Sequence, residues 1–179
     1  MSEMYQDMSY QTIKGNAGEK IYRAIRESDG YTLIHMYKDF PRGNGVRDVD
    51  FLCRNEARTF LGEVKAHDLK EFHGEKVFFL KKQEFTRSTK FARQQRRDLE
   101  IAFVDSITDK VYIASAKRLK QRFECNLLNF PMETKFSYGA CWVFHVGQFT
   151  EVRNIPAHLI QSLHDARIPN RDDDWVRFY

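Results

Sequence analysis

The sequence has 179 residues, of which 42% are hydrophobic and 14% aromatic, which excludes an intrinsically disordered chain and fits one domain. The formal net charge of +4 is a mild excess that points to an anionic partner. There is no apolar run of roughly 18 residues, no signal-peptide core in the polar first residues and no CxxC pair among the three cysteines. We therefore expect a cytoplasmic protein whose three cysteines are reduced core thiols, and no membrane contact.

Hydrophobic periodicity and turn residues predict the secondary structure in chain order. The predicted elements are a helix over 12–28, strands over 31–37, 46–53 and 59–65, a short apolar run over 77–80, a helix over 82–97, strands over 99–105 and 110–114, a short basic helix over 116–123, strands over 135–146 and 149–152, and a helix over 157–165. This order is typical of an α/β or α+β fold in which helices flank one central mixed β-sheet. We expect a single domain over 1–179, with a core over about 12–123 and a strand and helix extension over 124–179.

Acidic side chains gather on two neighbouring predicted strands. Residues two apart in a strand point the same way, so Asp48 and Asp50 share one face, and Glu63 and Lys65 share a face of the next strand. Glu19 on the first helix is a third candidate carboxylate. Converging carboxylates repel one another unless a proton or a cation compensates their charge. We expect Mg²⁺ to bind at such a site, and Mn²⁺ can replace it. With a lysine beside it, such a site suits phosphodiester hydrolysis.

At these positions the sequence resembles a known group of enzymes. Asp50, then Glu63-Val64-Lys65 thirteen residues on, after a helix that carries Glu19, is similar to the Asp…Glu-x-Lys core of the PD-(D/E)XK nuclease superfamily. The nearest likeness is to archaeal-type Holliday junction resolvases and related phage and restriction nucleases. The resemblance implies a restriction-endonuclease-like αβββαβ core in which Asp50, Glu63 and the Val64 carbonyl bind the metal. It also implies that Lys65 positions the nucleophile and that Glu19 contacts the site directly or through water.

The resemblance covers roughly residues 14–114, and it leaves two questions open. Val49 precedes the aspartate where the motif has proline, so Asp48 is a rival of Asp50 for the metal. The sequence also does not decide between one metal ion and two.

The predicted helix over 82–97 is basic on one side. At about 100° per residue, five polar side chains fall together on that side: Gln83, Arg87, Lys90, Arg93 and Arg97. The alternatives are a solvated face and a phosphate-binding face, and the upstream carboxylates favour DNA. In the related nucleases a polar residue early in this helix lies near the active site, which makes Gln83 and Arg87 the candidates here.

Two further features bear on nucleic-acid binding. Arg42 and Arg47 flank the turn that enters the strand of Asp50, which makes them candidates for DNA contacts near the scissile phosphate; a hairpin turn with surface charges is the alternative. Trp142 is predicted to belong to the core rather than to a base-stacking platform.

These observations predict a Mg²⁺-dependent endodeoxyribonuclease that acts on duplex or branched DNA. Cutting both strands, or resolving a four-way junction, requires two active sites, so we expect a homodimer with the region after about residue 123 as its interface. The alternatives are a non-catalytic nucleic-acid-binding module on a nuclease fold and an RNA nuclease.

Overall fold

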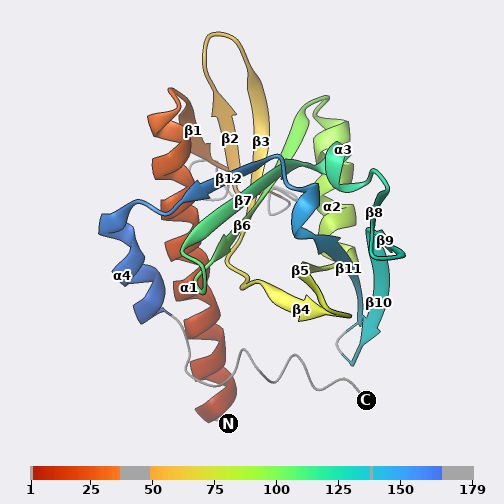
Figure 1. Cartoon of the computed structure of the whole chain (residues 1–179). Helices are drawn as coiled ribbons and strands as arrows, with labels where there is room; N and C mark the ends of the chain where they lie inside the picture. Colours follow the sequence, from red (N-terminus) through yellow and green to blue (C-terminus); the bar gives the residue numbers. More distant parts are fainter. Residues whose placement is uncertain (1, 37–48, 138, 167–179) are drawn as a thin grey trace.

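The structure, a computed structural model, describes residues 2–36, 49–137 and 139–166. At its centre is a six-stranded sheet, with helices on one face and a smaller four-stranded sheet and further helices on the other (Figure 1). The helices are α1 (Ser2–Ser28), α2 (Lys82–Gln94), α3 (Ala116–Leu119), α4 (Ala157–Asp165) and the single 3-10 turn η1 (Val146–Gln148).

The strands are β1 (Thr32–His35), β2 (Phe51–Arg54), β3 (Thr59–Lys65), β4 (Lys70–Phe72), β5 (Glu75–Lys81), β6 (Asp98–Asp105), β7 (Lys110–Ser115), β8 (Phe123–Cys125), β9 (Leu128–Phe130), β10 (Met132–Phe136), β11 (Gly139–His145) and β12 (Glu151–Asn154). The large sheet has the order β1-β2-β3-β6-β7-β12, with β3 and β6 parallel and the other neighbours antiparallel. The small sheet has the order β10-β11-β5-β4, and β8 and β9 form a separate hairpin.

The chain order α1-β1-β2-β3-α2-β6 confirms the predicted mixed α/β fold with an αβββαβ core. The strands β4 and β5 are inserted between β3 and α2, and they carry the small sheet. Because β11 pairs with β5, residues after 123 complete the same sheet layer as residues before α2.

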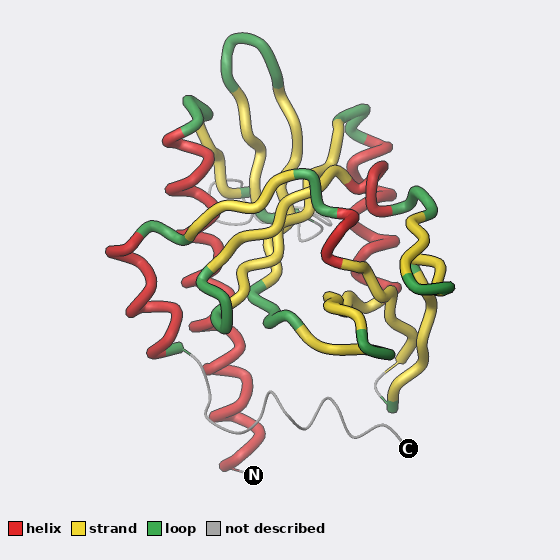
Figure 2. Tube along the Cα trace, viewed as in Figure 1, coloured by secondary structure: helices red, strands yellow, loops and turns green. Residues whose placement is uncertain are grey.

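The first helix is held by an apolar stripe and a glycine stop. Ala17, Ile21 and Ile25 recur at helical spacing and are buried against the large sheet. At its end Gly30 adopts a φ of +83°, and the N–H of Tyr31 donates to the carbonyl of Arg26 at 3.0 Å. This left-handed ending is the one for which glycine is favoured. On the same face of the sheet, α4 lies beside α1 (Figure 2).

Strand β3 separates the two halves of the core. Phe60 and Val64 are buried in the cluster that includes α1, whereas Leu61 is buried in the cluster on the α2 side. This alternation has the period of two that the sequence predicts, and it places Glu63 and Lys65 on the α2 side.

A buried polar network lies on the α1 side of the same sheet. Glu100 of β6 accepts hydrogen bonds from Tyr22 Oη at 2.6 Å and from Arg26 Nε at 2.9 Å, and Arg26 also pairs with Glu151 at 2.9 Å. The network needs a glycine beside it, because a Cβ at Gly62 would lie 2.7 Å from Tyr22 Oη.

Several predicted boundaries are wrong, each for a local reason. The helix over 82–97 ends at Gln94, because Arg96 has a φ of +52°, so Arg97 lies beyond the helix. The helix over 116–123 is one turn, and the chain then enters β8.

The long strand predicted over 135–146 is two antiparallel strands, β10 and β11. The first helix begins at Ser2 rather than near residue 12. The strand predicted over 46–53 is assigned from Phe51, although Asp50 N–H still donates to the Gly62 carbonyl; residues 46–48 lie outside the described residues.

Within the described residues, no helix is both long and apolar enough to span a membrane. The three cysteines are free thiols. Cys53 and Cys141 are buried as expected, whereas Cys125 is only partly buried, so the expectation of three core thiols is wrong for Cys125.

Candidate active site

Three strands and a helix meet at one edge of the large sheet. His35, the last residue of β1, is opposite Phe51, the first residue of β2, and Phe51 is opposite Gly62 of β3. The antiparallel pairing therefore brings the end of β1, the start of β2 and the end of β3 to the same place. The first turn of α2 joins them through an ion pair between Lys65 and Glu84.

Asp50 is fixed at this edge by the backbone of β3. Its Oδ2 accepts a hydrogen bond from the Val64 N–H at 2.7 Å, and its own N–H donates to the Gly62 carbonyl at 3.0 Å. Burial raises the pKa of Asp50, an effect that the Val64 N–H and Lys65 partly offset. The carboxylate therefore lies beside the residue whose carbonyl the resemblance assigns to the metal.

Glu63, Lys65 and Glu84 form a chain of charges. Lys65 Nζ lies 2.8 Å from Glu63 Oε1 and 3.0 Å from Glu84 Oε2. Burial raises the pKa of Glu63 to about 8, although Lys65 lowers it. Burial also disfavours the charge on Lys65, but the two carboxylates outweigh it and raise the lysine pKa above its ordinary value. The carboxyl groups of Glu63 and Glu84 therefore favour the protonated form of Lys65.

Glu19 reaches the edge from α1 through a histidine. Its Oε2 lies 2.7 Å from His35 Nε2, and the His35 ring packs edge-on against Phe51 at 5.0 Å between centroids. Glu19 raises the pKa of Asp50 and His35 lowers it, so both act on the same carboxyl group. Sequence reasoning missed His35, which was assigned only to a strand.

Sequence reasoning also missed the role of Glu84. The expected polar residue early in α2 was Gln83 or Arg87, but the residue of the first turn that contacts Lys65 is Glu84. Lys65 lowers the pKa of Glu84 although burial would raise it. A signal was present: Glu84 is the acidic residue in the first turn of an otherwise basic helix, a position that the helix dipole favours for a negative charge.

The remaining predicted residues fall into two groups. Gln83, Arg87, Lys90 and Arg93 lie on the exposed side of α2, and Arg97 is exposed beyond its end. Arg42, Arg47 and Asp48 lie outside the described residues, so the choice between Asp48 and Asp50 stays a prediction.

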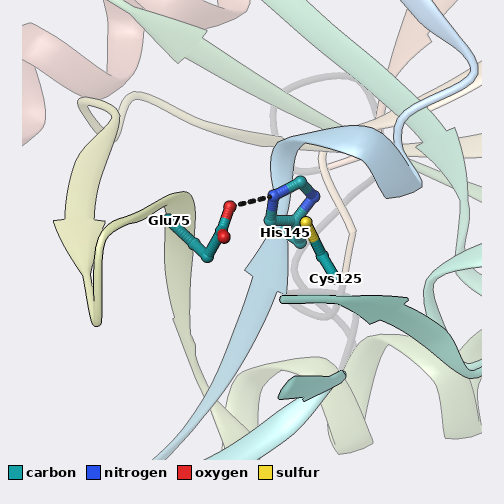
Figure 3. Close-up of side chains that lie close together, drawn as sticks. All are labelled: Glu75, Cys125 and His145. Atoms are coloured by element: carbon teal, nitrogen blue, oxygen red, sulfur yellow. Dashed lines mark hydrogen bonds and ion pairs between the residues drawn. The ribbon is translucent and has the colours of Figure 1, made fainter. Parts of the chain in front are cut away.

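A second group of potential metal ligands lies between the small sheet and the β8–β9 hairpin (Figure 3). Glu75, Cys125 and His145 place one ligand atom each within 4.8 Å of one another, the one such group of three in the described part of the chain. Glu75 Oε2 lies 3.0 Å from His145 Nε2, and Glu75 also accepts a hydrogen bond from the side-chain amide of Asn126.

The hydrogen bonding of His145 argues against a metal at this second group. The backbone N–H of Gly147 donates to His145 Nδ1 at 2.9 Å, so Nδ1 is an acceptor and Nε2 carries the proton given to Glu75. A histidine that binds a metal through Nε2 must instead protonate Nδ1 and donate from it. The group is therefore a hydrogen-bond junction that ties the β8–β9 hairpin to β5 and β11.

The donors around Asp50 and Glu63 do fit a hard divalent cation. Burial raises the pKa of both carboxyl groups, and the charge of Asp50 raises that of Glu63 further. Oxygen ligands of this kind are what Mg²⁺ prefers, and a cation would remove the cost of two ionised buried carboxylates. Asp50, Glu63 and the Val64 carbonyl are the ligands that this edge offers.

No family model and no curated protein matches the sequence. The solved structures of similar fold include Hjc and D212. Hjc from Archaeoglobus fulgidus, a Holliday junction resolvase of an archaeal hyperthermophile, shares 15% identity at a TM-score of 0.49, over 83% of this chain and 96% of Hjc. D212, a nuclease from a fusselovirus, shares 13% identity at a TM-score of 0.43, over 83% of this chain and 87% of D212.

Proposed function

We propose that the chain is a metal-dependent nuclease whose active site is the edge formed by β1, β2, β3 and α2. The observation that carries the proposal is the position of Lys65, an ammonium held at 2.8 Å from Glu63 and 3.0 Å from Glu84 on the strand beside Asp50. A lysine that only paired with a surface acid would be exposed and would contribute little. Here the cation and its carboxylates are largely buried.

The chain's own residues supply most of what phosphodiester hydrolysis requires. Lys65 stays protonated, so it neutralises the phosphate or orients the attacking water rather than removing a proton. Asp50, Glu63 and the Val64 carbonyl would hold Mg²⁺, and Glu19 with His35 would support Asp50. When bound, the metal supplies Lewis-acid stabilisation of the phosphate and a water of lowered pKa.

The substrate and assembly are the finer part of the proposal. The exposed basic side of α2, with Arg42 and Arg47, would contact the DNA backbone, which makes the enzyme an endodeoxyribonuclease on duplex or branched DNA. Two cuts need two sites, which supports a homodimer. The free thiols support a cytoplasmic location.

The test is a cleavage panel with a metal series. Supercoiled plasmid, linear duplex, single strand, RNA and a four-way junction are each incubated with Mg²⁺, Mn²⁺ or EDTA, for the wild type, Lys65→Ala and the control Lys76→Ala at an exposed position of β5. We expect metal-dependent DNA cleavage that Lys65→Ala abolishes and Lys76→Ala leaves unchanged. Salt-dependent DNA binding without cleavage would favour the non-catalytic module, and cleavage of RNA alone would favour the RNA nuclease.

A further inference from the structure

A basic and aromatic hollow lies along the flank of α2, outside the candidate active site. It has a volume of about 400 Å³ and is formed mainly by residues of α2, the end of α3 and β11. We name it the α2–β11 hollow and define it by its polar and aromatic lining: Thr86, Thr89, Lys90, Arg93, Lys120 and Trp142.

The charges of the hollow are free to bind an anion. Lys90, Arg93 and Lys120 are exposed, and no carboxylate of the described residues lies within ion-pair distance of any of them. Glu133 of β10 lies opposite Trp142 of β11. Its carboxylate pairs with Lys82 at 2.6 Å and not with a cation of the hollow. The hollow therefore presents uncompensated positive charge, which is complementary to phosphate.

The floor of the hollow is aromatic. Trp142 packs against the core cluster on the α2 side, as predicted, but it is only partly buried, whereas its neighbours in β11 are buried. Phe85 is buried beneath, with Lys120 Nζ 5.5 Å from its ring centroid. The indole of Trp142 is partly exposed, and Lys82 Nζ lies 5.3 Å from its ring centroid. A partly exposed indole beside ammonium groups is the combination that binds single-stranded nucleic acid, because every base has a face to stack while cations hold the backbone.

The hollow is separate from the cleavage site but adjacent to it. At about 100° per residue, Thr86 and Arg93 lie about 160° to 180° around α2 from Glu84, so the helix stands between the two. A duplex keeps its bases stacked inside and cannot offer one to Trp142. A strand that has left the duplex can.

We propose that the α2–β11 hollow binds a single-stranded DNA segment next to the duplex that is cut. Trp142 stacks on an unpaired base, while Lys90, Arg93 and Lys120 contact phosphates. This inference rests on the proposed nuclease function and deepens it, since it names DNA with an unpaired segment, such as a fork or flap, as the preferred substrate class.

The test uses the sequence's two tryptophans. In a Trp175→Phe background, Trp142 is the single tryptophan, and its fluorescence is followed during titration with oligothymidylate in EDTA, so that no cleavage interferes. We expect saturable quenching, and binding that Trp142→Ala weakens about 5- to 100-fold, the range for loss of one stacked base. A blunt duplex should quench Trp142 far less than the oligonucleotide.

A charge variant keeps the test decisive if Trp142→Ala fails to fold. The hollow variant combines two substitutions at exposed residues, Lys90→Glu and Lys120→Glu. The matched control combines Arg54→Glu and Lys76→Glu, which make the same change in net charge at exposed positions away from the hollow. We expect the hollow variant to bind oligothymidylate at least about 10-fold more weakly than the control. Its plot of log affinity against log salt should be less steep by about 0.7 for each phosphate that the hollow no longer neutralises.

The outcomes separate this inference from the proposed function. Equal binding by the hollow variant and its control, or equal quenching by duplex and single strand, would overturn the hollow as a single-strand site. Tighter binding of oligouridylate would overturn the assignment to DNA. If the wild type binds oligothymidylate through Trp142 but cuts no substrate, the proposed nuclease fails and the hollow stands. If the hollow variant cuts forked DNA with wild-type efficiency, the hollow fails and the nuclease stands.

Discussion

Two buried glutamates on neighbouring strands face opposite sides of the large sheet. Glu63 of β3 is 6% exposed and faces α2, whereas Glu100 of β6 is 7% exposed and faces α1. Burial raises the pKa of both carboxyl groups. The two sites differ in the partners that compensate this cost.

The network around Glu100 is closed. The guanidinium of Arg26 forms ion pairs with Glu100, Glu151 and Asp29. Arg153 pairs with Glu151 at 2.9 Å and with Asp29 at 3.0 Å. A planar guanidinium with several donors is well suited to hold more than one carboxylate in a fixed geometry. Every acid in this network has an arginine, so the network has no need of a ligand.

The edge around Glu63 is open by comparison. Glu63 and Glu84 share the single ammonium of Lys65, and Asp50 depends on the Val64 N–H and on charges at longer range. Lysine is a compact point charge and cannot satisfy three carboxylates at once. The comparison teaches that a buried carboxyl group does not by itself mark a functional site. Buried carboxyl groups that outnumber the side-chain cations beside them do.

The largest expected effect is on stability, from the closed network. Arg26→Met should destabilise the fold by about 3–5 kcal/mol, because it leaves Glu100 buried without its cation. Arg23→Met, which removes a half-exposed pair with Glu27, should cost under about 1 kcal/mol. Urea unfolding measures both. A loss within about 1 kcal/mol for Arg26→Met would show that the network is not structural and would remove the contrast.

The second effect is on activity, from the open edge. Glu63→Gln keeps the shape of the side chain but removes a metal-binding charge, so cleavage should fall by about 10²- to 10³-fold. The variant should stay folded, because a neutral amide replaces a buried carboxyl group. Single-turnover cleavage measures the activity and urea unfolding measures the stability, so the two effects can be separated. The control is Glu56→Gln in the exposed β2–β3 turn. Wild-type cleavage by Glu63→Gln would move the active site elsewhere.

A third, smaller effect tests the shared lysine. Glu84→Gln should lower kcat about 10-fold, since a hydrogen bond to a charged group contributes about 1.5–3 kcal/mol. The same variant should not weaken DNA binding, because it removes a negative charge. The exposed neighbour Gln83 gives the converse control: Gln83→Ala should weaken binding and leave kcat unchanged. Equal effects of both variants on kcat would mean that Glu84 does not position Lys65.

Local patterns predicted the framework of the site but not its contacts. The period of two in β3 placed Glu63 and Lys65 on one face, and the structure agrees. What the sequence could not provide is the pairing between distant segments. His35 reaches the edge through the register of β1 with β2, and Glu84 reaches it through the docking of α2 against β5, β6 and β11.

The same limit explains the errors outside the site. β10 ends at Phe136 and β11 begins at Gly139, so the two strands are close enough in the sequence to have been predicted as one. Trp142 was predicted to belong to the core, and it does pack against the α2-side cluster, but part of it lines the hollow beside α2 and Lys120. Neither is encoded in local periodicity.

The smallest expected effect is a dependence of stability on pH that comes from Glu63 and is isolated by comparing the wild type with Glu63→Gln. The folded pKa of Glu63 is about 8 against an ordinary 4.5, so between these values the folded state keeps a proton that the unfolded state has lost. The contribution of Glu63 to stability is then fully present below about pH 4.5 and is lost as the pH rises through 8. Without metal, the melting temperature of the wild type relative to Glu63→Gln should drop by several degrees from about pH 5 to about pH 8.5.

Mg²⁺ should oppose this trend, because a metal binds the ionised carboxylate and so stabilises the protein more at about pH 8.5 than at about pH 5. Glu100→Gln is the comparison for the closed network, where Arg26 and Tyr22 stay in place and Mg²⁺ should have the same effect as in the wild type. Thermal melts in EDTA and in Mg²⁺ at both pH values give the answer. If Mg²⁺ raises the melting temperature of Glu63→Gln as much as that of the wild type, then the metal does not bind at Glu63, and the open edge is not the place where the fold accommodates a cation.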